Sequence, residues 1–244
     1  MPVAGQAGAC YFDGMRSAWW RLVRLGFNLL YHQMAWSYDA VSWLASLGQW
    51  RAWQAAALPY VRGNRVLELA HGPGHMLLAL IRAGYTVTGL DLSAQMGRMA
   101  RRRLARAGCR AALVRGRGEA LPFTDNSFDT VYSSFPTPFI LAGETLQSVW
   151  RVLAPGGRLV VVPQAHLTGK EAASRFVNWL YWITGQRRDK PSERESSPAG
   201  AWVALLERQG FRLEVVPVAL ARSEVLVVVA HKDAGAGRAT PPVS

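Results

Sequence analysis

The sequence predicts a doubly wound α/β domain with a mostly parallel sheet of about seven strands and a C-terminal antiparallel hairpin. From Arg65 onward, short apolar runs alternate with amphipathic helical segments, which is the pattern of βαβ units. Near the C-terminus, two apolar runs are joined by a tight connection at Arg222–Ser223, which is typical of a hairpin. With 244 residues, half of them apolar, the chain is long enough to bury the core of such a domain.

The alternating region gives the elements in order. The expected strands are Arg65–Ala70, Thr86–Asp91, Ala111–Arg115, Phe128–Ser134, Arg158–Pro163, Phe211–Ala219 and Glu224–Ala230. The expected helices are Gly74–Ala83, Ala94–Ala107, Ala142–Leu153 and Ala201–Gln209, with Gly210 suited to a C-cap. Residues 155–157 (PGG) are expected to reverse the chain before the fifth strand and to be purely structural.

The chain divides into three parts around this alternation. Residues 1–60 are expected to be an N-terminal helical lid or extension. Its first 15 residues, rich in Gly and Ala, are expected to be loose, and residues 16–60, rich in Trp, Tyr, Leu and Ala, to form two or three amphipathic helices. Residues 61–232 are expected to form the α/β domain, and residues 233–244 a disordered tail. Within the domain, residues 168–184 are expected to add an apolar, aromatic helix, followed by a polar loop over residues 185–198.

Composition limits the cellular context. The sequence shows no run of 18 apolar residues and no secretory signal, so a cytoplasmic protein is expected. Its two cysteines provide neither a disulfide framework nor a metal-binding motif, so no metal is expected. The net charge of +12 has two interpretations. It can attract a polyanion or an anionic membrane surface. Alternatively, the net charge reflects a general preference for arginine in residue usage, and we favour this interpretation narrowly. In that case the arginines of one helix form a solvated face, namely Arg98, Arg101–Arg103 and Arg106.

A glycine-rich loop carries the chemical signal. Gly72 and Gly74 follow a strand and open a helix, where glycine allows a ligand to approach the backbone closely. About 20 residues beyond the loop, Asp91 ends the next strand, where a carboxylate can accept both hydroxyls of a ribose. The alternatives are a simple tight turn for the glycines and a helix cap for Asp91.

A dinucleotide-binding domain is the main rival, and two features disfavour it. The third glycine of the G-x-G-x-x-G pattern would fall at Leu77. Glu68 also lies inside the strand before the loop, where its carboxylate would repel a pyrophosphate. The same carboxylate suits the ammonium group of a cofactor that carries an amino acid.

Four motifs follow one another in the alternating region. They are Glu68–Gly74 (ELAHGPG), Gly89–Ser93 (GLDLS) with Met96, Gly118–Phe123 (GEALPF) with Asp125–Asp129 (DNSFD), and Trp150–Arg158 (WRVLAPGGR). In this order they resemble the class I S-adenosylmethionine-dependent methyltransferase superfamily, in its small-molecule branch. The resemblance runs from Arg65 to Pro163, with a continuation to Lys232, although Ala70 replaces the usual first glycine. It implies a Rossmann-like fold, with S-adenosylmethionine as cofactor.

The resemblance also assigns roles to residues. It implies that Asp91 binds the ribose and that Gly72 and Gly74 pass close to the methionine part. The other cofactor-binding residues that it implies are Glu68, Ala70, Leu92, Met96, Glu119, Ala120, Ser134 and Phe135. Of these, Leu92 and Met96 would flank the adenine, Glu119 and Ala120 would meet its edge, and Ser134 and Phe135 would lie near the methionine and the acceptor. Packing in the core is the alternative for Met96, and support of the sheet is the expected role of Asp129.

No catalytic residue can be assigned from the sequence, because an activated sulfonium methyl needs alignment more than a base. His166 and His32 are the better candidates for a general base, with packed or solvated side chains as the alternative. His71, His75, Tyr31, Tyr38 and Asp39 are weaker candidates.

A small, apolar, aromatic or lipid-like acceptor is expected. The segment after the fourth strand, Ser134–Thr137 (SFPT), lacks the Asn/Asp-Pro-Pro-Tyr motif of amide and adenine methylation. An apolar pocket can be walled by side chains of residues 176–183 and by four tryptophans of the N-terminal helices, namely Trp36, Trp43, Trp50 and Trp53. Alternatively, these side chains merely pack the helices onto the sheet, and we weigh the two equally. Basic helices with tryptophan also suit a peripheral membrane contact. A non-catalytic cofactor-binding module and a nucleic-acid methyltransferase, which only the charge favours, are the alternatives.

Overall fold

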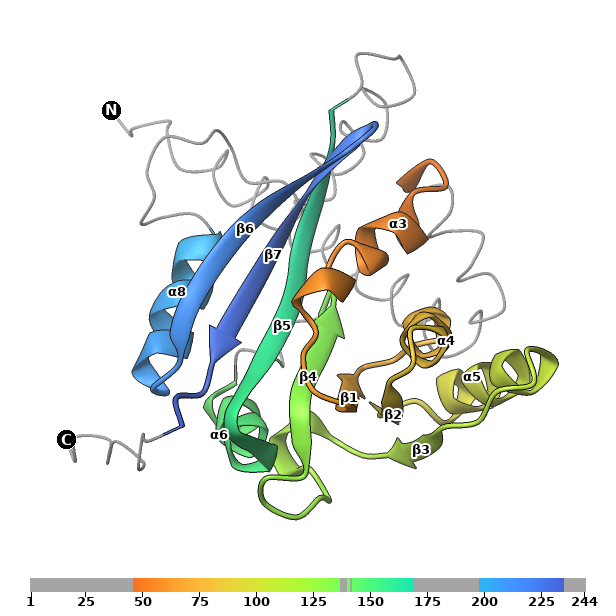
Figure 1. Ribbon diagram of the computed structural model, residues 1–244, viewed down its shortest axis with the longest axis horizontal. Helices are drawn as coiled ribbons and strands as arrows, with labels where there is room; N and C mark the ends of the chain where they lie inside the picture. The colour runs from red at the N-terminus through yellow and green to blue at the C-terminus, as the bar shows by residue number, and fades with distance from the viewer. Residues whose placement is uncertain (1–45, 137–139, 141, 169–197, 235–244) are drawn as a thin grey trace, which may run out of the picture.

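The computed structural model describes residues 46–136, 140, 142–168 and 198–234, and these form one mixed sheet with helices on both faces (Figure 1). The sheet has seven strands in the order β3-β2-β1-β4-β5-β7-β6. Its strands are β1 Arg65–Leu69, β2 Thr86–Asp91, β3 Ala112–Arg115, β4 Phe128–Ser134, β5 Leu153–Leu167, β6 Arg212–Leu220 and β7 Ser223–His231. The predicted α/β sheet is therefore confirmed.

Strand pairing separates a parallel core from an antiparallel edge. Strand β1 pairs in parallel with β2 on one side and with β4 on the other, and β2–β3 and β4–β5 are parallel as well. Strands β6 and β7 form the predicted antiparallel hairpin, with β7 against β5. The strand order thus reverses between β1 and β4, and in doubly wound sheets ligands bind at the carboxyl ends of such a pair of strands.

The helices fall into two layers (Figure 1). They are α3 Trp50–Ala55, α4 His75–Arg82, α5 Ala94–Arg106, α6 Gly143–Val152 and α8 Pro198–Arg208, with short 3-10 turns η2 Leu58–Tyr60 and η3 Gly118–Ala120. Side chains of α3, α4 and α5 share one hydrophobic cluster with β1, β4 and β5, whereas α6 and α8 belong to a second cluster on the opposite face. No helix in the described ranges has the length and apolarity to cross a membrane.

Two local features differ from the prediction or refine it. Residues 155–157 do not reverse the chain, because β5 already starts at Leu153 and continues through them. Gly156, at φ +76°, donates its N–H to the Lys232 carbonyl at 3.0 Å, and the Lys232 N–H donates to Gly157, so the segment pairs with the end of β7. The expected C-cap is confirmed in geometry, since Gly210 follows α8 with φ +90°.

Asp129, at the amino end of β4, supports the sheet. Its Oδ2 accepts the backbone N–H groups of Asn64 and Arg65, both at 2.9 Å, and its Oδ1 pairs with the Arg65 guanidinium at 2.6 Å. Arg65 is the main reason that the pKa of Asp129 is lowered to about 2. The carboxylate thus fixes the entry into β1 at the sheet edge opposite the glycine loop, as predicted for a structural residue.

Candidate functional site

The loop between β1 and α4 has a left-handed backbone at three positions. Ala70, Gly72 and Gly74 have φ values of +54°, +53° and +82°. A Cβ at Gly74 would lie 2.8 Å from Cβ of Ala100, so glycine is required there for α5 to pack against the loop. A Cβ at Gly72 would meet nothing within 4 Å. The backbone at Gly72 therefore borders open space at the carboxyl edge of the sheet, where a ligand can approach.

Asp91 connects β2 to this loop. Its Oδ2 accepts the N–H of Gly72 at 2.9 Å, and its Oδ1 accepts the N–H of Ser93 at 2.8 Å. The N-cap of α5 is Ser93, whose Oγ accepts the N–H of Met96 at 3.3 Å, and Asp91 contributes to this helix start only through its bond to the Ser93 N–H. Because an ionised carboxylate has about four acceptor positions, Asp91 retains capacity for two hydroxyl donors.

Glu68 is a buried carboxyl group in the middle of the sheet. Its side chain is 2% exposed, and its Cα pairs with Tyr132 of β4. Burial first, and the charge of Asp91 second, raise the pKa of Glu68 well above its usual value. Within the described part of the chain, Oε2 of Glu68 has no hydrogen-bond partner. An unpartnered buried acceptor is costly unless a donor from a ligand or water satisfies it.

Gln54 lies on α3 and was not predicted from the sequence as a site residue. Its Nε2 donates to Oγ of Ser134 at 2.8 Å, and its main-chain carbonyl accepts the hydroxyl of Tyr132 at 3.0 Å. Its Oε1 is buried and finds no donor among the described residues. One signal was available: with Trp50, Trp53 and Ala57, Gln54 completes the i, i+3, i+4, i+7 apolar face of a helix, where a glutamine is unexpected.

Gln54 and Glu68 lie on the same face of the sheet. Tyr132 links them, since it is the strand neighbour of Glu68 and hydrogen-bonds to Gln54. Burial and the nearby charge of Glu68 both raise the pKa of Tyr132, so its hydroxyl stays protonated and acts as a donor. Two buried acceptor oxygens without donors therefore flank one tyrosine, at the switch point between β1 and β4.

Aromatic side chains cover this position from the side of α3. Phe135, just past β4 and at φ +46°, stacks on Trp50 with ring centroids 4.4 Å apart. Trp53 is buried and donates its Nε1–H to Oγ of Ser223 at 2.8 Å. This tryptophan therefore packs α3 against the sheet. The predicted contributions of Trp36, Trp43 and residues 176–183 lie outside the described residues.

The predicted adenine-binding residues lie at the ends of β2 and β3. Leu92 is 58% exposed, whereas Met96 is 1% exposed, which favours the packing alternative for Met96. Glu119 and Ala120 belong to η3, after a loop whose Gly116 donates its N–H to the Asp91 carbonyl at 3.2 Å. The structure thus brings Leu92 and the loop before η3 to the end of β2, whereas η3 itself packs on α6.

The histidines divide into different environments. His71 is buried, its Nδ1 lies 2.7 Å from the Gly72 carbonyl, and burial is the main reason that its pKa is lowered. His166 does not follow the fifth strand as predicted, because β5 extends to Leu167 through pairing with β7, and its side chain is exposed. His32 lies outside the described residues. His71 therefore supports the loop, and the described residues assign no histidine as a general base.

Comparison with known proteins agrees with this geometry. A methyltransferase-domain family model matches residues 66–157. A demethylmenaquinone methyltransferase of Symbiobacterium thermophilum is 32% identical over 167 residues, 64% of each chain. A ubiquinone/menaquinone biosynthesis C-methyltransferase of Yersinia enterocolitica is 36% identical over 142 residues, 54% of this chain and 57% of the relative. The chain thus spans a little under two thirds of the length of these curated relatives.

Solved structures support the fold. A putative S-adenosyl-L-methionine-dependent methyltransferase from Methanococcus maripaludis superposes with a TM-score of 0.56, 17% identity and coverage of 80% of this chain and 90% of that one. A methyltransferase from Methanosarcina mazei gives 0.51 at 22% identity, with 72% and 96% covered. Together with the motifs from Glu68 to Arg158, these matches make the chain similar to class I S-adenosylmethionine-dependent methyltransferases, with a methyltransferase domain matched at residues 66–157.

Proposed function

We propose that this chain transfers the methyl group of S-adenosylmethionine to a small, apolar acceptor of the quinone type. The observation that carries the cofactor assignment is the pair of buried acceptors without donors, Oε2 of Glu68 and Oε1 of Gln54. They lie behind a glycine loop that is open at Gly72. The methionine part of the cofactor carries an ammonium and a sulfonium, so its positive charge matches this negative, donor-poor position.

The cofactor-binding residues follow from the same placement. Asp91 accepts the ribose hydroxyls with the lone pairs that Gly72 and Ser93 leave available. Glu68 and Gln54 receive the ammonium, directly or through water. Leu92 packs on the adenine from its exposed position, and Glu119 and Ala120 of η3 meet the adenine edge. These roles, and those of Ala70, Met96, Ser134 and Phe135, are proposals.

S-adenosylmethionine supplies a methyl group that is already activated by its sulfonium. The protein therefore has to align the acceptor atom in line with the S–CH₃ bond and exclude water, and neither task needs a nucleophilic side chain. Trp50 and Phe135, stacked beside Ser134, offer a flat apolar wall on the acceptor side. Methylation at a ring carbon also releases the proton of that carbon, to water or to a base for which we assign no residue.

The acceptor class rests on the named relatives. Those at 32% and 36% identity carry names that refer to demethylmenaquinone and to ubiquinone/menaquinone biosynthesis. An aromatic ring with an electron-rich carbon next to a hydroxyl fits the stacked pair Trp50–Phe135. We further propose that residues 1–60 form a lid over this acceptor, which extends the wall that begins at α3.

Two measurements test the function. S-adenosylhomocysteine should raise the melting temperature, whereas NAD should not, because only a ligand of the folded state stabilises it. Methyl-labelled S-adenosylmethionine should then label a 1,4-naphthoquinol with a short alkyl chain. Stabilisation by NAD alone would refute the cofactor. Binding of S-adenosylhomocysteine without transfer to quinols, phenols or catechols would instead favour a non-catalytic module.

A further inference from the structure

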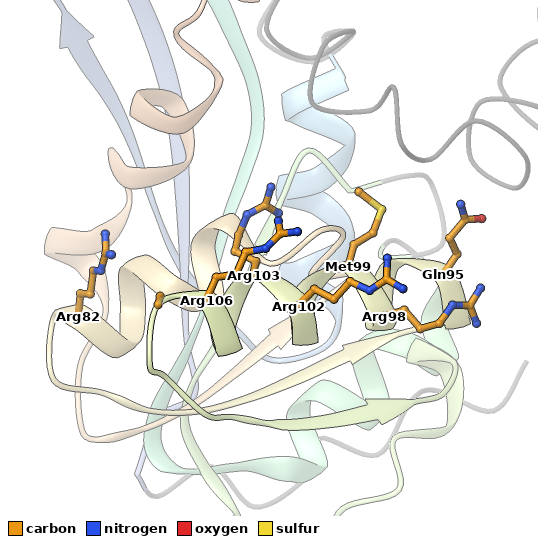
Figure 2. A pocket seen from close by; sticks show the side chains of 8 residues that line it. Arg82, Gln95, Arg98, Met99, Arg102, Arg103 and Arg106 are labelled. Atoms are coloured by element: carbon orange, nitrogen blue, oxygen red, sulfur yellow. The ribbon is translucent and has the colours of Figure 1, made fainter.

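A surface rich in arginine lies on the outer side of α5. Arg98, Arg102 and Arg106 follow one another at four-residue spacing, so their side chains share one helix face. With Arg82 at the end of α4 and Gln95, they line a hollow of about 600 Å³ (Figure 2). We call the three residues Arg98, Arg102 and Arg106 the arginine face.

Among the described residues, no acidic side chain pairs with this face. From residue 69 to residue 118 the chain has nine arginines and a single acid, Asp91, which is engaged with the glycine loop. Within the part of the chain that the structure describes, none of the three arginines forms an ion pair. Like charges four residues apart destabilise a helix. The arginine face is therefore a cluster of repelling charges that an anionic partner would relieve.

The arginine face is separate from the cofactor position. The opposite side of α5 packs on the glycine loop, where Ala100 meets Gly74 and Met96 is buried. Arg103 is half-buried and lines the same hollow as the arginine face, but its guanidinium also donates to the Pro73 carbonyl, so this arginine is not purely solvated as predicted. A partner on the arginine face would thus leave the cofactor loop uncovered, while lying one helix diameter from it.

We propose that the arginine face docks the protein on phosphate headgroups of an anionic lipid surface, a proposal that rests on the quinone-type acceptor proposed above. Guanidinium groups bind phosphate oxygens in pairs, and a row of them fits a plane of headgroups. Binding of single-stranded nucleic acid uses aromatic side chains for base stacking, and residues 92–118 contain none. A lipid-like acceptor also partitions into such a surface, next to the site.

The test uses the full chain and two matched double variants. Arg98→Gln/Arg102→Gln removes two charges from the arginine face. Arg208→Gln/Arg212→Gln removes two exposed arginines from α8 and from β6, the edge strand farthest from β3. Flotation is measured with vesicles of phosphatidylcholine alone and of equal parts phosphatidylcholine and phosphatidylglycerol. Each arginine near the surface contributes about fivefold in partitioning, so the first variant should bind anionic vesicles about 25-fold more weakly.

The control variant should bind like the wild type, and no form should bind neutral vesicles. Equal binding by the two variants, equal binding to neutral vesicles, or no vesicle binding at all would overturn the docking surface. So would tight binding of a single-stranded RNA that Arg98→Gln/Arg102→Gln abolishes without any effect on vesicles. The proposed function is tested without vesicles, by stabilisation with S-adenosylhomocysteine and by labelling of the dissolved short-chain quinol. A failure of the docking surface can therefore be told apart from a failure of the proposed function.

Discussion

The backbone N–H of Gly72 donates a hydrogen bond to Oδ2 of Asp91 at 2.9 Å, so the end of β2 restrains the loop that follows β1. The same carboxylate holds the start of α5 through the N–H of Ser93 at 2.8 Å. Asp91 is thus both a structural anchor for the loop and the acceptor proposed for the ribose. Substitutions can separate these two roles.

Asp91→Ala should weaken binding of S-adenosylhomocysteine by about one to three orders of magnitude, because it removes a charged acceptor for two hydroxyls. It should also lower the free energy of unfolding by about 1–2 kcal/mol, since Gly72 and Ser93 lose their acceptor. Asp91→Asn, which keeps one oxygen, should cost less affinity. Calorimetric titration and denaturant unfolding measure the two quantities.

Ser93→Ala is the matched control for Asp91. It removes the cap of α5, and so should cost about 1 kcal/mol of stability while leaving the affinity unchanged. A folded Asp91→Ala protein that binds S-adenosylhomocysteine like the wild type would mean that the cofactor lies elsewhere.

Glu68→Gln should stabilise the ligand-free protein at neutral pH and weaken cofactor binding about tenfold or more. Burial raises the pKa of Glu68 above 4.5, so the folded state holds this proton more tightly than the unfolded state. The stability of the wild type therefore falls as the pH rises above about 4.5 toward the folded pKa, and the variant lacks this loss. The stability gain should thus be larger at pH 8 than at pH 4.

Unfolding of both proteins at the two pH values checks the Glu68 prediction. Glu144→Gln, on the exposed surface of α6, is the control for the chemical change and should leave affinity and pH dependence as they are. If wild type and Glu68→Gln differed in stability by the same amount at pH 4 and pH 8, the carboxyl group would not be buried as described.

Gln54→Leu should lower cofactor affinity about tenfold, since the hydrogen bond to a charged group is lost, while stability changes by less than about 1 kcal/mol. Leucine has a similar volume and removes the buried Oε1 that lacks a donor, which offsets the lost bond to Ser134. Titration with S-adenosylhomocysteine and thermal unfolding are the measurements. Gln147→Leu, exposed on α6, controls for the added apolar group. Loss of stability with full affinity would make Gln54 a purely structural residue.

Ala70→Gly should raise the free energy of unfolding by about 1 kcal/mol, because Ala70 has φ +54° and glycine adopts this backbone without a Cβ clash. Ala79→Gly inside α4 should do the opposite by about the same amount, since a helical position favours alanine. Denaturant midpoints compare the two variants. A destabilised Ala70→Gly protein would show that the left-handed backbone carries no strain.

The local sequence was sufficient for the sheet core and the cofactor loop. The predicted bounds of Thr86–Asp91 and Phe128–Ser134 are confirmed, because the apolar period of a strand and the polar residues that end it are local properties. The spacing of Glu68, the glycines and Asp91 likewise predicted that they meet at one edge, since parallel strands joined by one helix must align their carboxyl ends. Their cofactor roles stay predictions, as does the lid over residues 1–60.

Tertiary structure alone decided the contacts that complete the site. Gln54 reaches Ser134 across 80 positions of sequence, and β5 extends to Leu167 because β7 pairs with it. Arg103, which was predicted to be solvated, donates to the Pro73 carbonyl of the glycine loop. Periodicity and spacing report only on near neighbours in the chain. Which donor satisfies which buried acceptor depends on how separate elements pack, so the unpartnered oxygens of Glu68 and Gln54 became visible only in three dimensions.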